Sequence, residues 1–404
     1  MPYTLRKIIN DPVYGFITIS HPLIFKIISH PYFQRLRRIN QMALASLVYP
    51  GAVHTRLHHS LGAYHLMCNA LNELCSKGTD ITPEEELAVN AAILLHDIGH
   101  GPFSHALENE LLPGIHHEEI SLQIMHAMND EFEGKLTKAI EIFTDQYHKK
   151  FLHQLVSGQL DMDRMDYLTR DSFFTGVSEG VIGYDRILKM LTIHNGQLMV
   201  EEKGIYSIEK FLVARRLMYW QVYLHKTVLV AEKMLIQVTR RVRFLYGVGA
   251  LDLSTGTPVD FFLTSFSGIM DGEALRHFCV MDDFDFIHCL KVWSRSNDKV
   301  LSTLCTNILN RQLLKIKFQG EPFMDDLKQQ NIEHAFQALH ISPEEASYFV
   351  FSGEAVNTMY QTNDERINIL FKDGQVKDIS QVDNALIHKT LASAVKKFYI
   401  CFYQ

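Results

Sequence analysis

The feature that most restricts the fold of this chain is one long stretch of helical apolar spacing. It runs from about Ile208 to Phe244, with Ser207 placed to cap its start and Gly247 just past its end. A second segment, "VLSTLCTNILNRQLL", forms one apolar stripe with residues spaced by three and four: Val300, Leu301, Leu304, Cys305, Ile308 and Leu309. Helical spacing dominates the chain, so the sequence predicts a mainly α fold.

A few short segments carry β patterns instead. Asn195-Gly196 lies between alternating residues in "LTIHNGQLMVEEKGIYS", and Asp373-Gly374 repeats that arrangement in "RINILFKDGQVKDIS". Both dipeptides are typical of two-residue hairpin turns. The last residues, "KKFYICFYQ", favour a strand. We therefore expect a helical core over residues 1–345, with a hairpin near 190–206, and a small mixed α/β lobe over 346–404.

Composition excludes several broad classes of protein. The 404 residues carry a formal net charge of −7, which argues against nonspecific binding to nucleic acid or membranes. The six cysteines form no C-x-x-C pair, so we expect reduced thiols rather than a disulfide framework. The first residues, "MPYTLRKIIND", lack an apolar signal region, and no apolar run is long enough to span a bilayer. These features predict a cytoplasmic protein.

The stretch "LLHDIGHGPFSH" carries the densest set of reactive side chains. His96 and Asp97 are adjacent within an apolar context, where unpaired polar groups are costly. Imidazole nitrogen and carboxylate oxygen bind divalent metals together, provided that other segments complete the site. Such segments exist upstream, with His58, His59 and His65, and downstream, with Asp161, Asp163, Asp166 and Asp171. The alternative, a surface pair or a satisfied core contact, stays open on residue chemistry alone.

Two helical faces gather further polar residues. At about 100° per residue, Asp163, Tyr167 and Asp171 share one face. In the long helix, a narrow arc holds Arg215, Tyr219, Tyr223 and Lys226. Such a face is either a solvated side of an amphipathic helix or a wall that presents cations to phosphates and phenols to a sugar or base.

Several ordered motifs together resemble the HD-domain phosphohydrolases, and within them the deoxynucleoside triphosphate (dNTP) triphosphohydrolase branch. They are "FQRLRRINQMALASLVYPGAVHTRLHHSLG", "LLHDIGHGPFSH", "IHHEEIS", "LDMDRMDYLTRD" and "RRLMYWQVYLHK", and the resemblance fades after about Phe318. It implies an HD-domain helical core with a small β-hairpin insertion and a small C-terminal α/β lobe. It also implies one divalent metal ion (Mg, Mn, Fe or Zn), with four ligands: His59, His96, Asp97 and Asp163.

The resemblance assigns roles to further residues. Proton transfer around the α-phosphate falls to His100, His105 and His117, with Glu108 close by in place of a family aspartate. Arg56 and Arg215 match phosphate-binding arginines, and Arg164 stands where a lysine is known. The sugar would meet Gln41, Met42, Tyr167, Asp171 and Tyr223, with Tyr219 replacing a histidine near the base.

The implied reaction is hydrolysis of a dNTP to deoxynucleoside and inorganic triphosphate by a homo-oligomer, a dimer or a tetramer. Two alternatives remain. One is another HD phosphohydrolase, either a nucleoside monophosphatase or a cyclic-nucleotide phosphodiesterase; the other is a nucleotide-binding regulator with little turnover. Nucleic acid is an unlikely partner, because the basic runs "QRLRRIN" and "RRVRF" are short.

Overall fold

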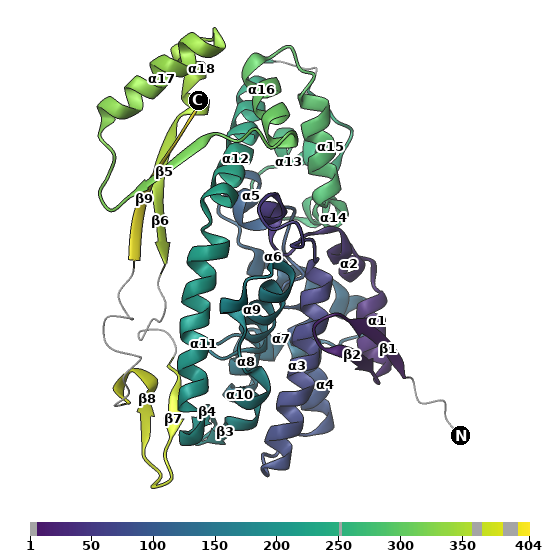
Figure 1. Cartoon of the computed structure of the whole chain (residues 1–404). Coiled ribbons are helices and arrows are strands. Elements are labelled where there is room, and N and C mark those ends of the chain that lie inside the picture. The colour runs from purple at the N-terminus through teal and green to yellow at the C-terminus, as the bar shows by residue number, and fades with distance from the viewer. Residues whose placement is uncertain (1–5, 250–252, 358–365, 383–394) are drawn as a thin grey trace.

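The computed structural model describes residues 6–249, 253–357, 366–382 and 395–404. Helices build a tall body, with small sheets along one side (Figure 1). The helices of the first half are α1 (Pro22–Ser29), α2 (Pro31–Gln34), α3 (Arg56–Ser76), α4 (Pro83–Leu95), α5 (Ser104–Leu111), α6 (His117–Glu131), α7 (Thr137–Phe143), α8 (Lys150–Val156), α9 (Met162–Thr175) and α10 (Tyr184–Met190).

The helices of the second half are α11 (Ile205–Met218), α12 (Lys226–Gly247), α13 (Pro258–Thr264), α14 (Gly272–Val280), α15 (Asp283–Trp293), α16 (Lys299–Leu309), α17 (Asp325–Leu339) and α18 (Pro343–Ala346). Short helical turns are η1 (Arg35–Arg38), η2 (Ala43–Leu47), η3 (Ser178–Gly180), η4 (Glu202–Gly204), η5 (Tyr219–Tyr223), η6 (Ser347–Phe349) and η7 (Ile379–Gln381). The fold is therefore mainly α, as the sequence predicts, and the expected apolar stripe near residue 300 is helix α16.

Helix α3 is the central helix of the body and packs against α4 and α9. A capping box fixes its start, because Thr55 and His58 each bond the other's backbone. Gly62 lets α9 approach closely, since a Cβ there would lie 2.0 Å from Asp166 Oδ1 and 2.2 Å from Arg170 Nη2. The contact between α3 and α9 thus depends on a residue without a side chain.

Helix α4 ends earlier than the glycines after it suggest. We expect Gly99, Gly101 and Pro102 to end this helix, but it stops at Leu95, so His96 and Asp97 lie in the turn that follows. Ser121 on α6 bonds the backbone of this turn on both sides. Its hydroxyl donates to His96 O at 2.8 Å and accepts from Gly99 N at 2.9 Å. This contact holds the His-Asp turn against α6.

The long helix predicted between Ile208 and Phe244 is interrupted, and its predicted cap is wrong. The helical segment begins at Ile205, before Ser207, and Gly247 is its last residue rather than a residue beyond it. In between, η5 is a π-helical turn, in which Leu224 N bonds Tyr219 O at 2.7 Å. His225 then caps α12 by accepting from Thr227 N through Nδ1. In Figure 1, α11 and α12 therefore follow one another along the body as two rods.

The strands are β1 (Lys7–Asp11), β2 (Gly15–Ile19), β3 (Leu191–His194), β4 (Gln197–Glu201), β5 (Lys315–Gln319), β6 (Phe351–Asn357), β7 (Asn368–Leu370), β8 (Val376–Asp378) and β9 (Val395–Phe402). The predicted hairpins at Asn195-Gly196 and Asp373-Gly374 are confirmed as β3–β4 and β7–β8. The two hairpins join in one sheet of order β3-β4-β7-β8, through a parallel pairing of β4 with β7.

The predicted C-terminal strand is confirmed as β9, the central strand of a sheet of order β5-β9-β6. Strand β5 precedes residue 345, so this sheet draws on chain from both sides of the expected boundary. The division into residues 1–345 and 346–404 stays a prediction. The hairpin β1–β2 near the N-terminus was not expected from the sequence.

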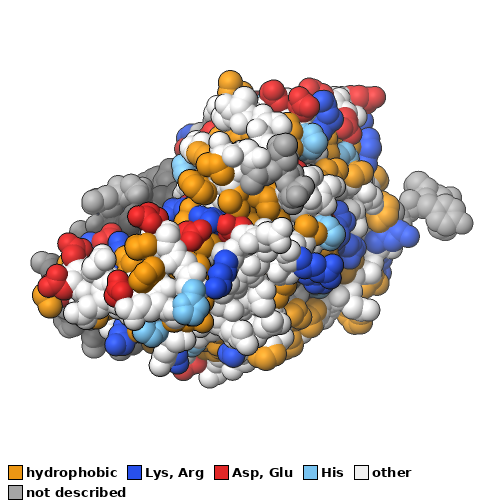
Figure 2. All heavy atoms as spheres, turned by 90° about the horizontal axis from the view of Figure 1, so that it is seen from above, with side chains coloured by type: hydrophobic (Ala, Val, Ile, Leu, Met, Phe, Trp, Pro, Cys, Tyr) orange, Lys and Arg blue, Asp and Glu red, His pale blue; other side chains and the backbone are white. Residues whose placement is uncertain are grey.

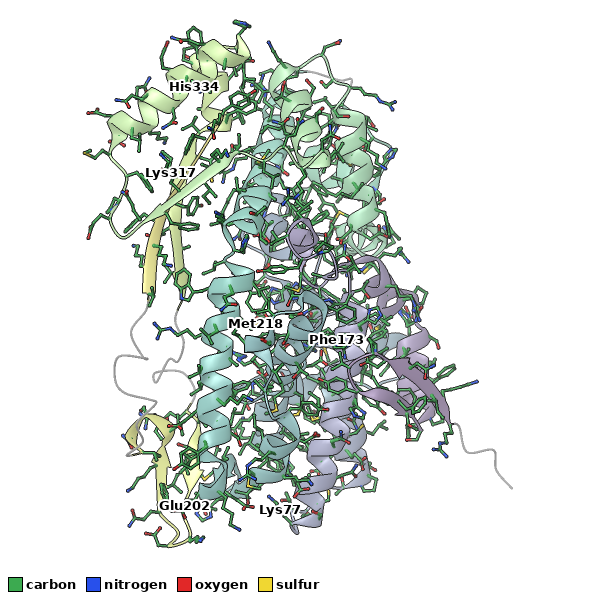
Figure 3. All side chains as sticks on the ribbon, viewed as in Figure 1. Lys77, Phe173, Glu202, Met218, Lys317 and His334 are labelled. Atoms are coloured by element: carbon green, nitrogen blue, oxygen red, sulfur yellow. The ribbon has the colours of Figure 1, made fainter. Side chains whose placement is uncertain are left out.

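The surface carries charges of both signs. Lys, Arg, Asp and Glu side chains are mixed over the end of the molecule that Figure 2 shows, with hydrophobic side chains among them. Lys317 on β5 is exposed, whereas Met218 at the end of α11 is buried (Figure 3). Among the described residues, no helix combines the length and the apolar character needed to cross a bilayer.

We predict that Gly62→Ala destabilises the protein. Alanine in an exposed helix interior gains about 1 kcal/mol over glycine, but here the new Cβ would displace the buried Asp166–Arg170 pair. Breaking a buried pair costs about 3–5 kcal/mol, so we expect a net loss of about 2–4 kcal/mol in urea unfolding. The matched control is Gly247→Ala in α12, where a Cβ meets nothing within 4 Å. Equal stability of the two variants would contradict this account of the α3–α9 contact.

Candidate metal and phosphate site

Three ligand atoms from distant segments converge at the middle of the body. They come from His59 on α3, His96 after α4 and Asp163 on α9, and lie within 4.8 Å of one another. His59 Nε2 is 3.4 Å from His96 Nε2 and 3.1 Å from Asp163 Oδ1. His96 Nε2 lies 3.6 Å from the same carboxylate oxygen. The structure thus unites the residues that spacing alone could only suggest.

The opposite nitrogens of both imidazoles are already bonded. His59 Nδ1 donates to Asp166 Oδ2 at 2.8 Å, and His96 Nδ1 donates to Ile93 O at 2.6 Å. With the proton on Nδ1, each neutral ring turns an Nε2 lone pair toward the other. Two lone pairs and a carboxylate facing one point fit a bound cation. The donor set therefore fits the divalent metal that the sequence predicts.

The charges around the cluster also favour a cation. Burial lowers the pKa of His59, but hydrogen bonds with Asp163 and Asp166 outweigh burial and raise it to about 10. Burial raises the pKa of Asp163, but hydrogen bonds from His59 and His96 lower it overall. The carboxylates therefore stay ionised and demand positive charge, which a metal ion supplies when the imidazoles are neutral.

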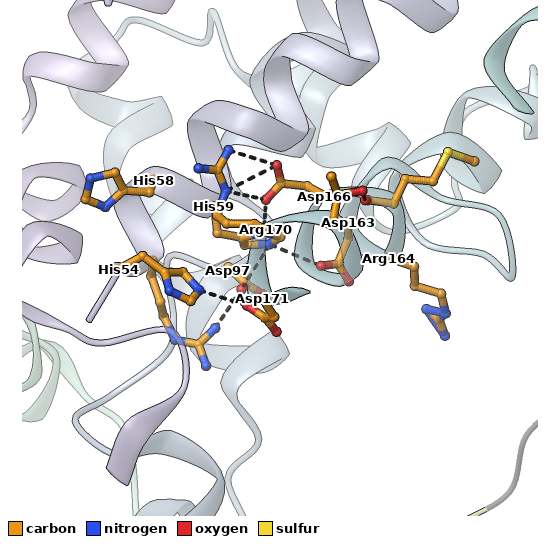
Figure 4. A network of polar contacts seen from close by, with 12 residues as sticks. His54, His58, His59, Asp97, Asp163, Arg164, Asp166, Arg170 and Asp171 are labelled. Atoms are coloured by element: carbon orange, nitrogen blue, oxygen red, sulfur yellow. Dashed lines mark hydrogen bonds and ion pairs between the residues drawn. The ribbon is translucent and has the colours of Figure 1, made fainter. Parts of the chain in front are cut away.

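A buried ionic network holds His59 from behind. Asp166 accepts from Arg170 Nε at 3.0 Å (Figure 4). On its other side, Arg170 Nη1 donates to Asp11 at 2.8 Å. Arg170 and Asp166 are fully buried. Such pairs of metal ligand and outer carboxylate fix both the tautomer and the orientation of the ring.

Asp97 lies beside the three converging atoms and links them to the phosphate side. Its Oδ1 is 3.4 Å from His96 Nε2 and its Oδ2 is 3.7 Å from His59 Nε2. Arg56 Nη1 donates to Oδ2 at 2.7 Å, and His100 Nε2 is 3.2 Å from Oδ1. Burial raises the pKa of Asp97, but His96, His100 and Arg56 lower it well below its usual range. Asp97 is therefore an anion placed to serve as the fourth ligand.

His100 and His117 form a stacked pair next to this cluster. Their ring centroids are 4.0 Å apart with the planes 18° apart. Burial and then Arg56 lower the pKa of His100 well below its usual range. Burial also lowers the pKa of His117, but Glu108, with Oε2 3.2 Å from His117 Nδ1, raises it overall. The surroundings thus favour the neutral form of His100 and the protonated form of His117. The side chain of His105 lies outside the described residues.

A cavity of about 470 Å³ opens next to the cluster. Its size is typical of small-molecule sites. All nine side chains predicted to bind substrate line it: Gln41, Met42, Arg56, Arg164, Tyr167, Asp171, Arg215, Tyr219 and Tyr223. The predicted catalytic residues His100 and His117 and the predicted metal ligands Asp97 and Asp163 line it as well. Glu108 is placed behind His117 and is absent from this wall. Lys226, on the same predicted arc as Tyr223, lies beyond the helix break and is exposed.

Three arginines of the wall keep donor capacity for a ligand. Arg56 bonds Asp97, Arg164 Nη1 donates to Asp161 Oδ2 at 3.0 Å, and Arg215 Nη1 donates to Gln159 Oε1 at 3.1 Å. The Nε–H of each is buried and has no acceptor among the described residues. Unpaired buried donors are costly, so these guanidinium groups are arranged for an anion that the protein itself does not supply.

The cavity is bounded elsewhere by phenols and a carboxylate. Tyr223 OH donates to Asp171 Oδ2 at 2.7 Å. His54 Nε2 donates to Asp171 Oδ1 at 2.8 Å (Figure 4). The Tyr219 and Tyr167 rings meet Tyr223 edge to face, with centroids 5.2 Å and 6.1 Å away. The orientation of Tyr223 is therefore fixed by its hydrogen bond to Asp171 and by the two neighbouring tyrosine rings.

Comparisons with known proteins agree with this geometry. The HD domain family matches residues 56–171, and the HD associated region matches residues 182–250. A phosphohydrolase of known structure from Bacteroides thetaiotaomicron is 50% identical, with a TM-score of 0.95, over 99% of this chain and 100% of its own. The chain belongs to the HD-domain phosphohydrolase family.

Two other proteins are similar to this HD phosphohydrolase over most of its length. The uncharacterized protein YwfO of Bacillus subtilis is 30% identical over 392 residues, 93% of this chain and 87% of its own. The deoxynucleoside triphosphate triphosphohydrolase SAMHD1 of Bos taurus is 25% identical over 426 residues, 94% of this chain and 68% of its own length.

The site of this HD phosphohydrolase includes residues that sequence reasoning missed. His54 lies inside the first motif, but no role is predicted for it from the sequence. Asp283 on α15 accepts from Asn40 N at 2.8 Å and Phe103 N at 3.3 Å, so it joins two loops of the site. Glu232 on α12 lines the cavity. Sequence reasoning missed Glu232 because, at about 100° per residue, an uninterrupted helix would put it on the face opposite Tyr223, about 180° away.

We predict that His96→Ala or Asp97→Ala removes the bound metal and abolishes phosphohydrolase activity while the fold survives. Each variant deletes a donor atom from a converging set of four. Metal content by mass spectrometry and circular dichroism measure the two effects. His65→Ala is the control, because His65 lies on α3 with His59 but bonds Asn69 instead. Full metal content and activity in either site variant would refute the assignment.

Proposed function

We propose that this HD phosphohydrolase hydrolyses dNTPs to deoxynucleoside and inorganic triphosphate. The observation that carries the proposal is the make-up of its cavity, whose lining includes Asp97 and Asp163 of the metal cluster, three arginines, and Asp171 with three tyrosines. A nucleoside triphosphate offers matching groups, an anionic tail together with a neutral sugar and base. The name of the bovine relative, a deoxynucleoside triphosphate triphosphohydrolase, supports the same substrate class.

The arginines would bind the triphosphate. Arg56, Arg164 and Arg215 supply guanidinium groups with an unused Nε–H each, and planar guanidinium groups bind phosphate oxygens in pairs. Arg164 is oriented by Asp161, which also caps α9 through Arg164 N at 2.6 Å. A nucleoside monophosphate has less use for three such groups, which favours the triphosphate over the monophosphatase alternative.

The Asp171–Tyr223 pair supports a deoxyribose rather than a ribose. The Tyr223 phenol is held by Asp171, and Asp171 is held in turn by His54, so the ring has little freedom to move aside. In the proposed pose Tyr223 fills the space that a 2′-hydroxyl would need. Gln41, whose Oε1 is buried and has no partner within the part of the chain that the structure describes, would accept from the 3′-hydroxyl.

The proton chemistry falls to the stacked histidines. His59, His96, Asp97 and Asp163 would hold the divalent ion, which when bound supplies Lewis-acid polarisation of the α-phosphoryl group. Water adds its oxygen to the α-phosphorus, and the bond to O5′ breaks. One proton of the water stays on the triphosphate, and the other restores the proton that the acid gives to O5′. Protonated His117, oriented by Glu108, would donate the proton that O5′ needs, while Arg56 offsets the negative charge.

The test is product analysis of the metal-loaded enzyme with each dNTP and each ribonucleotide. We expect chromatography to show deoxynucleoside and triphosphate in equal amounts, with dNTPs preferred over ribonucleotides. Monophosphate or pyrophosphate among the products would favour another HD phosphohydrolase. Tight dNTP binding without any product would favour a nucleotide-binding regulator. Self-association into a dimer or tetramer stays a prediction of the family resemblance.

We predict that Glu108→Gln shifts the alkaline limb of the pH–rate profile to lower pH. Glu108 raises the pKa of His117, so its protonated form persists to higher pH in the native enzyme. Without the carboxylate this pKa falls, and activity is lost sooner as pH rises. The control is Glu110→Gln, because Glu110 lies on the same helix and bonds Arg240. An alkaline limb unchanged in Glu108→Gln would remove His117 from the role of proton donor.

A further inference from the structure

Glu232 is the acidic residue of the cavity wall that the proposed reaction leaves unused. The other carboxylates of the wall have partners, with Asp97 on Arg56, Asp163 on His59 and Asp171 on Tyr223. Glu232 is half-buried and makes no hydrogen bond or ion pair with the described residues. Burial raises the pKa of this carboxyl to about 7. A desolvated acceptor with no protein partner is poised for donors from a ligand.

The arginines of the cavity do not neutralise Glu232. Glu232 lies on α12 and Arg215 on α11, on opposite sides of the helix break. Arg56, Arg164 and Arg215 bond Asp97, Asp161 and Gln159 instead. Apolar residues line the same cavity, among them Ala43, Ala45, Val222 and Leu224. Glu232 is therefore a carboxylate of the cavity that is left available for a ligand.

We propose that Glu232 reads the Watson–Crick edge of the nucleobase and makes the enzyme prefer guanine. This inference rests on the proposed dNTP function. An ionised carboxylate is a pure acceptor with two oxygens, so it favours an edge with two neighbouring donors. Guanine offers N1–H and the N2 amino group side by side. Adenine and cytosine place an acceptor nitrogen beside their amino group, and thymine flanks its single N–H with two carbonyls.

Charge argues against the opposite placement of the substrate. A triphosphate lying against Glu232 would leave Arg56, Arg164 and Arg215 without their anion and would set like charges together. A carboxylate can also hold a second cation on the phosphates, and that role would affect every dNTP equally. The two roles therefore predict different patterns across the four bases.

The experiment compares Glu232→Gln with the native enzyme at pH 8, where the carboxylate is ionised. One arm measures kcat/KM for dATP, dCTP, dGTP, dTTP and dITP with metal bound. A second arm measures Kd for dGTP and dITP by calorimetry after chelation, when no turnover occurs. Deoxyinosine keeps N1–H but lacks the N2 amino group. The charge-matched control is Glu273→Gln, an exposed residue at the start of α14.

We expect the native enzyme to favour dGTP over dITP about tenfold in both arms, because one charged hydrogen bond is lost. In Glu232→Gln, kcat/KM for dGTP should fall by about 10- to 100-fold, while kcat/KM for the other dNTPs should change by less than about threefold. An equal loss of kcat/KM for all four bases would overturn the proposed recognition of guanine. So would a ratio of kcat/KM for dGTP to that for dITP that is the same in the variant as in the native enzyme. Selective dGTP binding without any triphosphate product would support the recognition of guanine and overturn the proposed function.

Discussion

The architecture of the site depends on the buried ionic network that links Asp11, Arg170, Asp166 and His59. Isolated charges in a protein interior are strongly unfavourable, so Arg170 is stable only because it bonds carboxylates on both sides. That requirement ties the β1 strand to α9 and α9 to α3. It also fixes His59 with Nδ1 toward Asp166 and Nε2 toward His96 and Asp163. Gly62 gives the network its room, since any side chain there would collide with the pair.

The cavity depends on a second constraint, the break between α11 and α12. The π-helical turn of η5 and the cap at His225 change the direction in which later side chains point. Before the break, Arg215, Tyr219 and Tyr223 face the cavity at four-residue spacing; after it, Glu232 faces the same space. π-helical turns are frequent at functional sites. Here the turn lets residues of α11, η5 and α12 line the same ligand cavity.

Much of the fold was predictable because its signals are local. The Asn-Gly and Asp-Gly turns, the stripe of α16 and the final strand are each encoded within a dozen residues. The helix break was not predictable, because neither Pro nor Gly marks Leu224 or His225. Strand β5 was missed because its partner β9 lies some eighty residues later in the chain. In the site, the ordered motifs pointed to the metal cluster. The contact of His54 with Asp171 and the place of Glu232 in the cavity lining arise only from tertiary structure.

The central claim is that His59, His96, Asp97 and Asp163 hold a single divalent ion. The most direct measurement is anomalous X-ray diffraction from crystals of the protein soaked with Mn²⁺. The account predicts one strong anomalous peak within about 2.0–2.4 Å of His59 Nε2, His96 Nε2 and a carboxylate oxygen of Asp163. An active protein whose anomalous peak lies elsewhere, or which shows none at saturating Mn²⁺, would contradict it.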